Sequence, residues 1–185
     1  RGLGDVYKRQ TVYHYSMNDG GDFYAQNIRI GNGQIIFDFV TPKETIKDIE
    51  LGVPVKINIE NSIAAMAIAW LNGVSATDIK NAVASFQGAK RRFDFWIKRD
   101  DLVMIDDYAH HPDEIKASIS SVKELYPEKK ISVIFQPHLY TRTRDFAPQF
   151  AKALSLADEL ILLDIYPARE EPIPGVTSEI IFDKV

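Results

Sequence analysis

The 185-residue chain contains no cysteine, so disulfide bonds and thiolate metal sites are excluded. It has no apolar stretch of the roughly 18 residues that a membrane-spanning helix needs, and no signal-peptide pattern. It has no excess of basic residues either, because the net charge is -4 and the pI is about 5.6. These absences argue against a membrane partner and a general nucleic-acid partner, and we expect a cytoplasmic location.

Two glycine-rich nucleotide motifs are also missing. The chain holds neither Gly-x-x-x-x-Gly-Lys-Ser/Thr nor Gly-x-Gly-x-x-Gly, and so it carries no phosphate-binding loop of these types. Hydrophobic residues make up 45% of the chain. That content is enough to bury the core of one large domain or two small ones.

The first half of the chain predicts strands followed by helices. Residues 1–10 show no period, and we interpret them as a non-native, artefactual segment. Residues 11–42 are rich in β-branched and aromatic residues separated by turn signals, and 45–50 is a further possible strand. Apolar residues then recur at Ile63, Met66, Ala67 and Trp70, as in a helix. We place a domain boundary near residues 87–92, giving domains 11–90 and 91–185.

The second half alternates between strands and helices. Strands are predicted at about 92–98 and 102–107, with a turn at 99–101, and at 131–135 and 159–163. Helices are predicted at 112–126 and at about 143–157. The last two strands are short continuous apolar runs, which indicate a sheet buried on both faces. The alternation predicts an α/β fold with a mostly parallel sheet.

Polar residues follow three of these strands, in the runs "IDDYAHHPDEI" (105–115), "FQPHLYTRTRDF" (135–146) and "DIYPAREEP" (164–172). If the strands are parallel, their carboxyl ends share one rim, where ligands of such sheets bind. A simpler interpretation exists for some of these residues. His111, Asp113 and Glu114 could serve only to begin a helix, and Arg144 could belong to a solvated face.

Two further blocks precede the three runs just quoted: "NIENSIAAMAIAW" (58–70) and "FQGAKRRFD" (86–94). With these five blocks in this order, the chain resembles the Mur ligase family. The resemblance implies an ATP-dependent ligase that forms an amide bond in peptidoglycan synthesis. Its implied substrates are ATP, L-alanine and UDP-N-acetylmuramate, whose carboxylate is activated as an acyl phosphate. The implied fold is part of a central-domain β-sheet with helices, followed by a Rossmann-like, mostly parallel α/β domain.

The resemblance also implies that the chain is a fragment. Residues 11–90 would be the end of the central ATP-binding domain, and 91–185 would be a truncated C-terminal ligase domain. The phosphate loop and most of the ligands of the magnesium ion would lie in the absent part. We therefore expect the 185-residue chain to have no ligase activity alone.

Nucleotide-binding residues are implied at positions that match the family's motifs. They are Asn58 and Asn61, of which Asn61 is similar to the adenine contact, together with Arg92 and Asp107. A carboxamide suits adenine because it can both donate and accept hydrogen bonds. The family has a histidine where this chain has Ile57, so a nucleotide contact from that position is not expected.

Residues around the incoming alanine are implied in the same way, namely Tyr108, His110, His138 and Arg142. Arg142 would bind the carboxylate of the amino acid. His110 would accept the proton of the attacking amine. The family often has a second arginine where this chain has Leu139, so the carboxylate clamp would be incomplete or helped by Arg144 or a water.

Two alternatives stay open at this point. Asp106, Asp107, His110, His111 and His138 could hold a divalent metal pair in a metal-dependent phosphoesterase or other hydrolase. The chain could also be a non-catalytic module that binds a nucleotide or an amino acid.

Overall fold

The computed structural model describes residues 10–18 and 20–185, and it consists of two compact units. The first unit comprises the chain up to Ile30 and Gln34–Gln87, and the second comprises Gly31–Gly33 and Gly88–Val185. The segment interpreted as artefactual falls, apart from residue 10, outside the described residues.

The first unit contains a four-stranded sheet in the order β1-β2-β3-β4. Its strands are β1 (Tyr15–Ser16), β2 (Phe23–Gly31), β3 (Gln34–Val40) and β4 (Thr45–Glu50). β1 runs parallel to β2, and β3 runs antiparallel to β4 with a register shift between Phe37 and Phe39. Asn32 and Gly33 join β2 to β3 with φ values of 52° and 72°, the backbone that a tight hairpin turn of this type requires. The strand expected over the first residues of this region is confined to Tyr15–Ser16.

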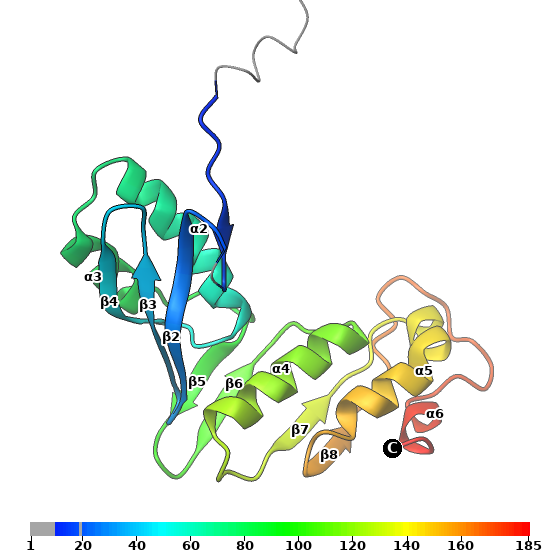
Figure 1. Ribbon diagram of the computed structural model, residues 1–185. Coiled ribbons are helices and arrows are strands. Elements are labelled where there is room, and N and C mark those ends of the chain that lie inside the picture. The colour runs from blue at the N-terminus through cyan, green and yellow to red at the C-terminus, as the bar shows by residue number, and fades with distance from the viewer. Residues whose placement is uncertain (1–9, 19) are drawn as a thin grey trace, which may run out of the picture. The chain divides into compact units, whose positions relative to one another are not determined.

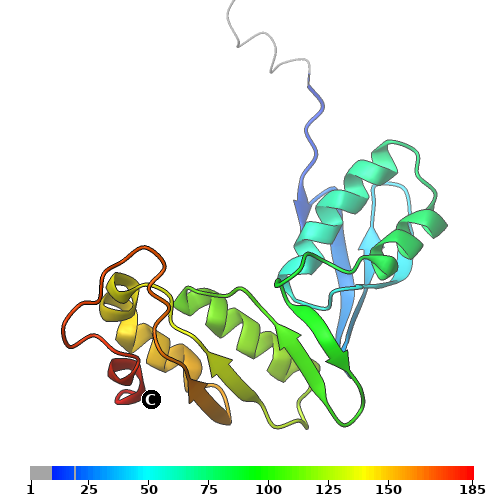
Figure 2. The ribbon, with the colours of Figure 1, turned by 180° about the vertical axis from the view of Figure 1, so that it is seen from behind.

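Two helices, α2 (Ile57–Leu71) and α3 (Ala76–Ser85), cover one face of this sheet (Figures 1 and 2). The buried face of α2 is formed by Ile59, Ile63, Met66 and Ala67, at the helical spacing that the sequence predicts. The sheet contributes fully buried aromatic rings, and Phe23 stacks on Phe39 with centroids 5.9 Å apart. Ser75 caps α3 by accepting a hydrogen bond from the Asp78 N–H at 3.1 Å, as serine commonly does at the start of a helix.

The second unit contains two separate strand pairs. β5 (Asp94–Lys98) pairs antiparallel with β6 (Val103–Asp106), and β7 (Ser132–Phe135) pairs parallel with β8 (Glu159–Leu162). Among the described residues, no hydrogen-bonded ladder joins β6 to β7 or β8. The short turn at 99–101 lets β6 pair locally with β5, and its hydrogen bonds in the described part of the chain go to that strand.

Three helices complete this unit: α4 (Pro112–Leu125), α5 (Tyr140–Leu154) and the short α6 (Glu179–Phe182). α4 and α5 lie on one face of the β7–β8 pair (Figures 1 and 2). Ile115, Ile119, Phe150, Leu154 and Ile181 are at most 5% exposed and form the centre of the core between these elements. Burial of such side chains contributes about 1.5–3 kcal/mol each. The predicted α/β class with helices alternating with strands is confirmed.

Candidate functional site

The turn after β6 is fixed by contacts with the segment before β5. The Tyr108 N–H donates to the Arg91 carbonyl at 2.7 Å, and the Arg91 guanidinium lies 5.0 Å from the centre of the Tyr108 ring. Arg91 Nε also lies 3.9 Å from an Asp106 carboxylate oxygen. The sequence singles out Arg92, yet it is Arg91 that reaches this turn, and both residues are exposed. Arg91 has a positive φ of 60°, and no pattern in the sequence predicted this backbone conformation.

Glu114 ties the two histidines of this turn to the start of α4. Its carboxylate accepts the backbone N–H groups of His110 and His111 at 3.0 and 3.1 Å. These hydrogen bonds, with the nearby imidazoles, lower the pKa of Glu114, while desolvation opposes the shift. The His111 ring accepts from the Asp113 N–H at 3.4 Å and completes a capping box. The simpler interpretation of His111, Asp113 and Glu114 as helix-start residues is therefore what the structure shows.

His110 is placed differently from His111. Its Nδ1 lies 3.0 Å from the Tyr108 carbonyl oxygen, and its ring centre lies 5.3 Å from that of Tyr108. The side chain is 41% exposed. Nε2 is the other ring nitrogen, and it is available for proton transfer if Nδ1–H donates to the carbonyl.

His138 lies just beyond the end of β7 and is half-buried. Its ring stacks on Tyr166 with centroids 5.5 Å apart, and its Nδ1 is buried with no hydrogen-bond partner. Burial lowers the pKa of His138, and the positive charges of Arg142 and His110 lower it further, against an opposing effect of Glu170. His138 is therefore held in its neutral form near pH 7.

Arg142 lies in the first turn of α5, which starts at Tyr140 rather than at the expected residue 143. Its Nη1 is buried without a hydrogen-bond partner, like the Nδ1 of His138. The helix has no capping side chain at its own N-cap, Leu139. Instead Glu170, from the segment after β8, accepts hydrogen bonds from the N–H and the hydroxyl of Thr141. Glu170 is a site-forming residue whose role in capping the helix the sequence did not reveal.

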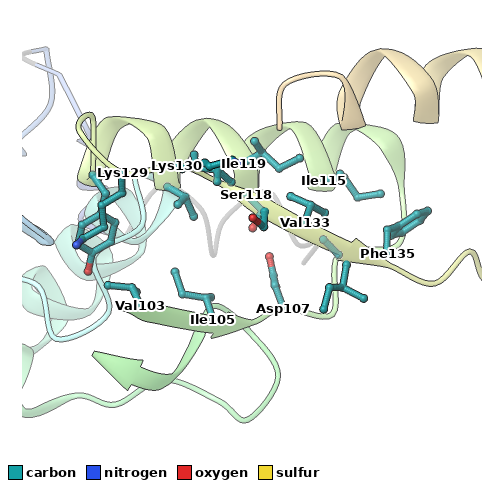
Figure 3. A pocket seen from close by; sticks show the side chains of 16 residues that line it. Val103, Ile105, Asp107, Ile115, Ser118, Ile119, Lys129, Lys130, Val133 and Phe135 are labelled. Atoms are coloured by element: carbon teal, nitrogen blue, oxygen red, sulfur yellow. The ribbon is translucent and has the colours of Figure 1, made fainter. Parts of the chain in front are cut away.

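The structure thus gathers part of the predicted set. His110, Arg142 and Glu170, which come from three strand ends, all act electrostatically on the pKa of His138. Asp107 has a different partner, since its carboxylate accepts the Phe93 N–H at 3.3 Å. It lines a cavity between β6 and β7, into which its side chain points (Figure 3).

The two asparagines predicted to contact a nucleotide lie in the first unit. Asn58 donates to the Val53 carbonyl at 3.1 Å, and Asn61 donates to the Asn58 side-chain oxygen at 3.3 Å. Both line a mainly apolar cavity of about 370 Å³ between α2 and α3, which is closed on one side by Phe86. A flat aromatic base with polar edges fits such a cavity, because apolar walls cover its faces and the two amides can meet its edge.

The arrangement of the described side chains gives little support for a metal site. Among the residues that the structure describes, no three His, Cys, Asp or Glu side chains are arranged to ligate one ion. The carboxylates that the hydrolase alternative needs are engaged elsewhere: Asp107 with the Phe93 N–H and Asp106 near Arg91. Nor does any helix within residues 10–18 and 20–185 combine the length and apolar character needed to cross a membrane.

These features define an α/β domain with a histidine and arginine site at the carboxyl ends of its strands, where such domains bind ligands. Residues 91–185 match the family described as "Mur ligase, glutamate ligase domain". The chain belongs to the Mur ligase family.

Individual relatives agree with this assignment. The chain is 68% identical over 173 residues to UDP-N-acetylmuramate–L-alanine ligase from Parabacteroides distasonis, covering 94% of this chain and 37% of that protein. It is 61% identical to the ligase of the same name from Phocaeicola vulgatus, covering 93% and 37%. The crystal structure of UDP-N-acetylmuramate-alanine ligase from Thermotoga maritima superposes with a TM-score of 0.72 at 28% identity, covering 90% of this chain and 35% of that one. The chain therefore spans little more than a third of the relatives it matches.

Proposed function

We propose that this chain is part of an ATP-dependent ligase that joins L-alanine to the carboxylate of UDP-N-acetylmuramate during peptidoglycan synthesis. The names of the relatives support this activity. Because the chain spans 37% of the length of those relatives, we assign turnover to the complete ligase and expect none from these 185 residues alone. A cytoplasmic location is part of the same proposal.

The observation that carries the proposal is the pair of buried, unpartnered nitrogen atoms, His138 Nδ1 and Arg142 Nη1. An unsatisfied buried polar group costs about 1–3 kcal/mol, so a ligand that pairs with both atoms recovers this cost. A free amino acid offers a carboxylate to the guanidinium and an amine to the imidazole. Arg142 would then hold the carboxylate, and neutral His138 would orient the amine.

His110 is the proposed proton acceptor. An amine must lose a proton to become part of an amide, and a half-exposed imidazole near the bound amine can take that proton and pass it to water. Tyr108 would form the side of the site, since its ring packs against His110. The two catalytic assignments are therefore His110 for proton transfer and Arg142 for charge and orientation.

ATP and Mg²⁺ are the proposed cofactors, and ATP would supply the phosphoryl group that activates the carboxylate. Within this chain, Asn58 and Asn61 would bind the adenine through the cavity that they line. Arg92 and Asp107 stay predicted nucleotide contacts. Arg92 is exposed and able to reach a ligand, whereas Asp107 would first have to release the Phe93 N–H.

The test uses a complete ligase in which this chain replaces the matching segment of the Parabacteroides distasonis protein. We expect ADP release that depends on both UDP-N-acetylmuramate and L-alanine. Arg142→Ala should raise the KM for L-alanine much more than the KM for ATP, because it removes the carboxylate partner. The matched control is Lys152→Ala, since Lys152 is an exposed cation in the last turn of the same helix. Equal effects of Arg142→Ala on the two KM values would contradict the assignment.

A further inference from the structure

A tight turn after β8 brings Glu170 to the start of α5. The Glu170 N–H donates to the Pro167 carbonyl oxygen at 3.0 Å and closes this turn. Tyr166, before the turn, stacks on the ring of His138, and Glu170, after it, accepts the Thr141 N–H at 2.9 Å. The segment after β8 is therefore attached to the segment after β7 on both sides of the turn.

Glu170 keeps its negative charge and part of its capacity to accept hydrogen bonds. The hydroxyl and the N–H of Thr141 donate to different oxygens of its carboxylate. These two bonds, that of the hydroxyl foremost, lower the pKa of Glu170, while desolvation opposes the shift. An ionised carboxylate has about four acceptor positions, so about two of them are left by Thr141. The side chain is only partly buried, and a ligand can reach it.

The candidate site thus holds two opposite charges that do not neutralise each other. Glu170 and Arg142 both act electrostatically on His138, in opposite senses. The ion pairs found among the described residues do not include one between Glu170 and Arg142. Nη1 of Arg142 also lacks a hydrogen-bond partner. A ligand with one positive and one negative group can satisfy both residues at once.

We propose that Glu170 binds the ammonium group of the incoming amino acid, while Arg142 binds its carboxylate. The inference rests on the proposed function, which assigns the carboxylate to Arg142. A free amino acid carries both charges near pH 7. Neutral His138 can orient the ammonium group but has no charge to balance it, whereas a hydrogen bond to an ionised carboxylate is roughly twice as strong as a neutral one.

This assignment defines the class of ligand that the site accepts. A 2-hydroxy acid has the carboxylate and lacks the ammonium group, so it loses the contact with Glu170. An amino acid amide has the ammonium group and lacks the carboxylate, so it loses the contact with Arg142. The site is therefore selective for α-amino acids that carry both charges.

A purely structural role of Glu170 makes a different prediction. If Glu170 only fixes the first turn of α5 through Thr141, its loss displaces Arg142 and weakens every ligand that has a carboxylate. If Glu170 also binds the ammonium group, its loss weakens only ligands that have this group. L-alanine and L-lactate separate the two roles, because they differ by an ammonium group in place of a hydroxyl.

The test measures binding of L-alanine and of L-lactate to the complete chimeric ligase described above. NMR titrations are run with UDP-N-acetylmuramate and a non-hydrolysable ATP analogue present, so that no turnover occurs. We expect Glu170→Gln to weaken the binding of L-alanine at least about tenfold, as for a lost charge-assisted hydrogen bond. The binding of L-lactate should not weaken. Arg142→Ala, in contrast, should weaken the binding of both ligands.

Two further variants control for damage to the fold. Glu170→Asp keeps the negative charge and should retain more of the preference for L-alanine over L-lactate than Glu170→Gln does. Glu171→Gln changes the exposed neighbouring carboxylate and should alter neither affinity. Equal weakening of the two ligands by Glu170→Gln, or unchanged binding of L-alanine, would overturn the proposal.

The outcome for Glu170 can be separated from that for the ligase activity. A chimera that shows the expected difference between the ligands and yet releases no ADP with UDP-N-acetylmuramate and L-alanine would reject the ligase function and keep the ammonium site. A chimera that turns over, with both ligands weakened equally by Glu170→Gln, would do the reverse. Absence of L-alanine binding in the unmodified chimera would reject both.

Discussion

The imidazole of His138 stacks on the ring of Tyr166, with centroids 5.5 Å apart and planes inclined by 28°. The same two residues form an isolated parallel β-bridge beyond the ends of β7 and β8. The Leu139 N–H donates to the Tyr166 carbonyl at 2.9 Å, and the Tyr166 N–H donates to the Pro137 carbonyl at 2.8 Å. The stacked pair therefore adds an isolated parallel bridge beyond the β7–β8 ladder and covers part of the His138 ring.

Removal of this ring should change the protonation of His138. Tyr166→Ala lets water reach the imidazole, so the pKa of His138 should rise from its lowered value toward about 6.5. The measurement is an NMR titration of the His138 ring protons. Tyr166→Phe keeps the aromatic cover and should leave the titration unchanged. A titration that stays the same in Tyr166→Ala would show that the ring does not cause the shift.

Glu170 should act on His138 in the opposite sense. Its negative charge raises the pKa of His138, so Glu170→Gln should lower that pKa further. The variant should also weaken the start of α5, because Thr141 loses a charged acceptor, so we expect the free energy of unfolding to fall. Glu171→Gln, at the exposed neighbouring position, is the control and should change neither quantity.

Leu139 occupies a backbone conformation that few side chains adopt, with φ of 74° and ψ of 132°. A β-branched residue fits this region less well than leucine does, so Leu139→Val should lower the free energy of unfolding by about 1–2 kcal/mol. Leu139→Gly adopts the same backbone freely and should be more stable than Leu139→Val in urea unfolding. The reverse order of the two variants would show that side-chain packing, and not the backbone, decides this position.

The contrast between α4 and α5 shows what the sequence could and could not predict. The start of α4 was predicted correctly at Pro112, because Pro112 and Glu114 are local signals of a helix start. The start of α5 was placed about three residues late. Its cap comes from Glu170, far along the chain, and its N-cap residue Leu139 has no capping side chain.

Strand partners were harder to predict than strand positions. The positions of β6, β7 and β8 follow from their apolar runs, yet β6 pairs with β5 and not with β7. Sequence periodicity reports which residues are buried and carries no information on the neighbouring strand. In the candidate site, sequence motifs were enough to propose His138 and Arg142. The contact of Arg91 with Tyr108 could not be predicted in this way, because it depends on a positive φ that no sequence pattern indicates.

Asp38 should make the first unit sensitive to acid. It is 6% exposed and accepts hydrogen bonds from the Asn27 side chain and the Asp48 N–H, each at 2.9 Å. These bonds, that of Asn27 foremost, lower the pKa of Asp38. A carboxylate with a lowered folded-state pKa contributes stability that is present above its unfolded pKa of about 3.9 and is lost as the pH falls through the folded value.

Asp38→Asn should therefore flatten the acid limb of the stability curve below about pH 4. Asp38→Ala leaves two donors without an acceptor and should cost roughly 1–3 kcal/mol at pH 7. Urea unfolding at a series of pH values checks both expectations. An acid limb that is identical in wild type and Asp38→Asn would place the sensitivity elsewhere.

The hydrogen bonds from Thr141 to Glu170 join residues that are far apart in the chain, and the ribosome adds Thr141 well before Glu170. The first turn of α5 cannot reach its final form until β8 and the segment behind it have been synthesised. Contacts of this sequence separation form late, because a long loop must close before they do. Arg142 in that turn is thus positioned by a contact that waits for Glu170, and an incompletely translated chain would lack an organised form of the proposed amino-acid site.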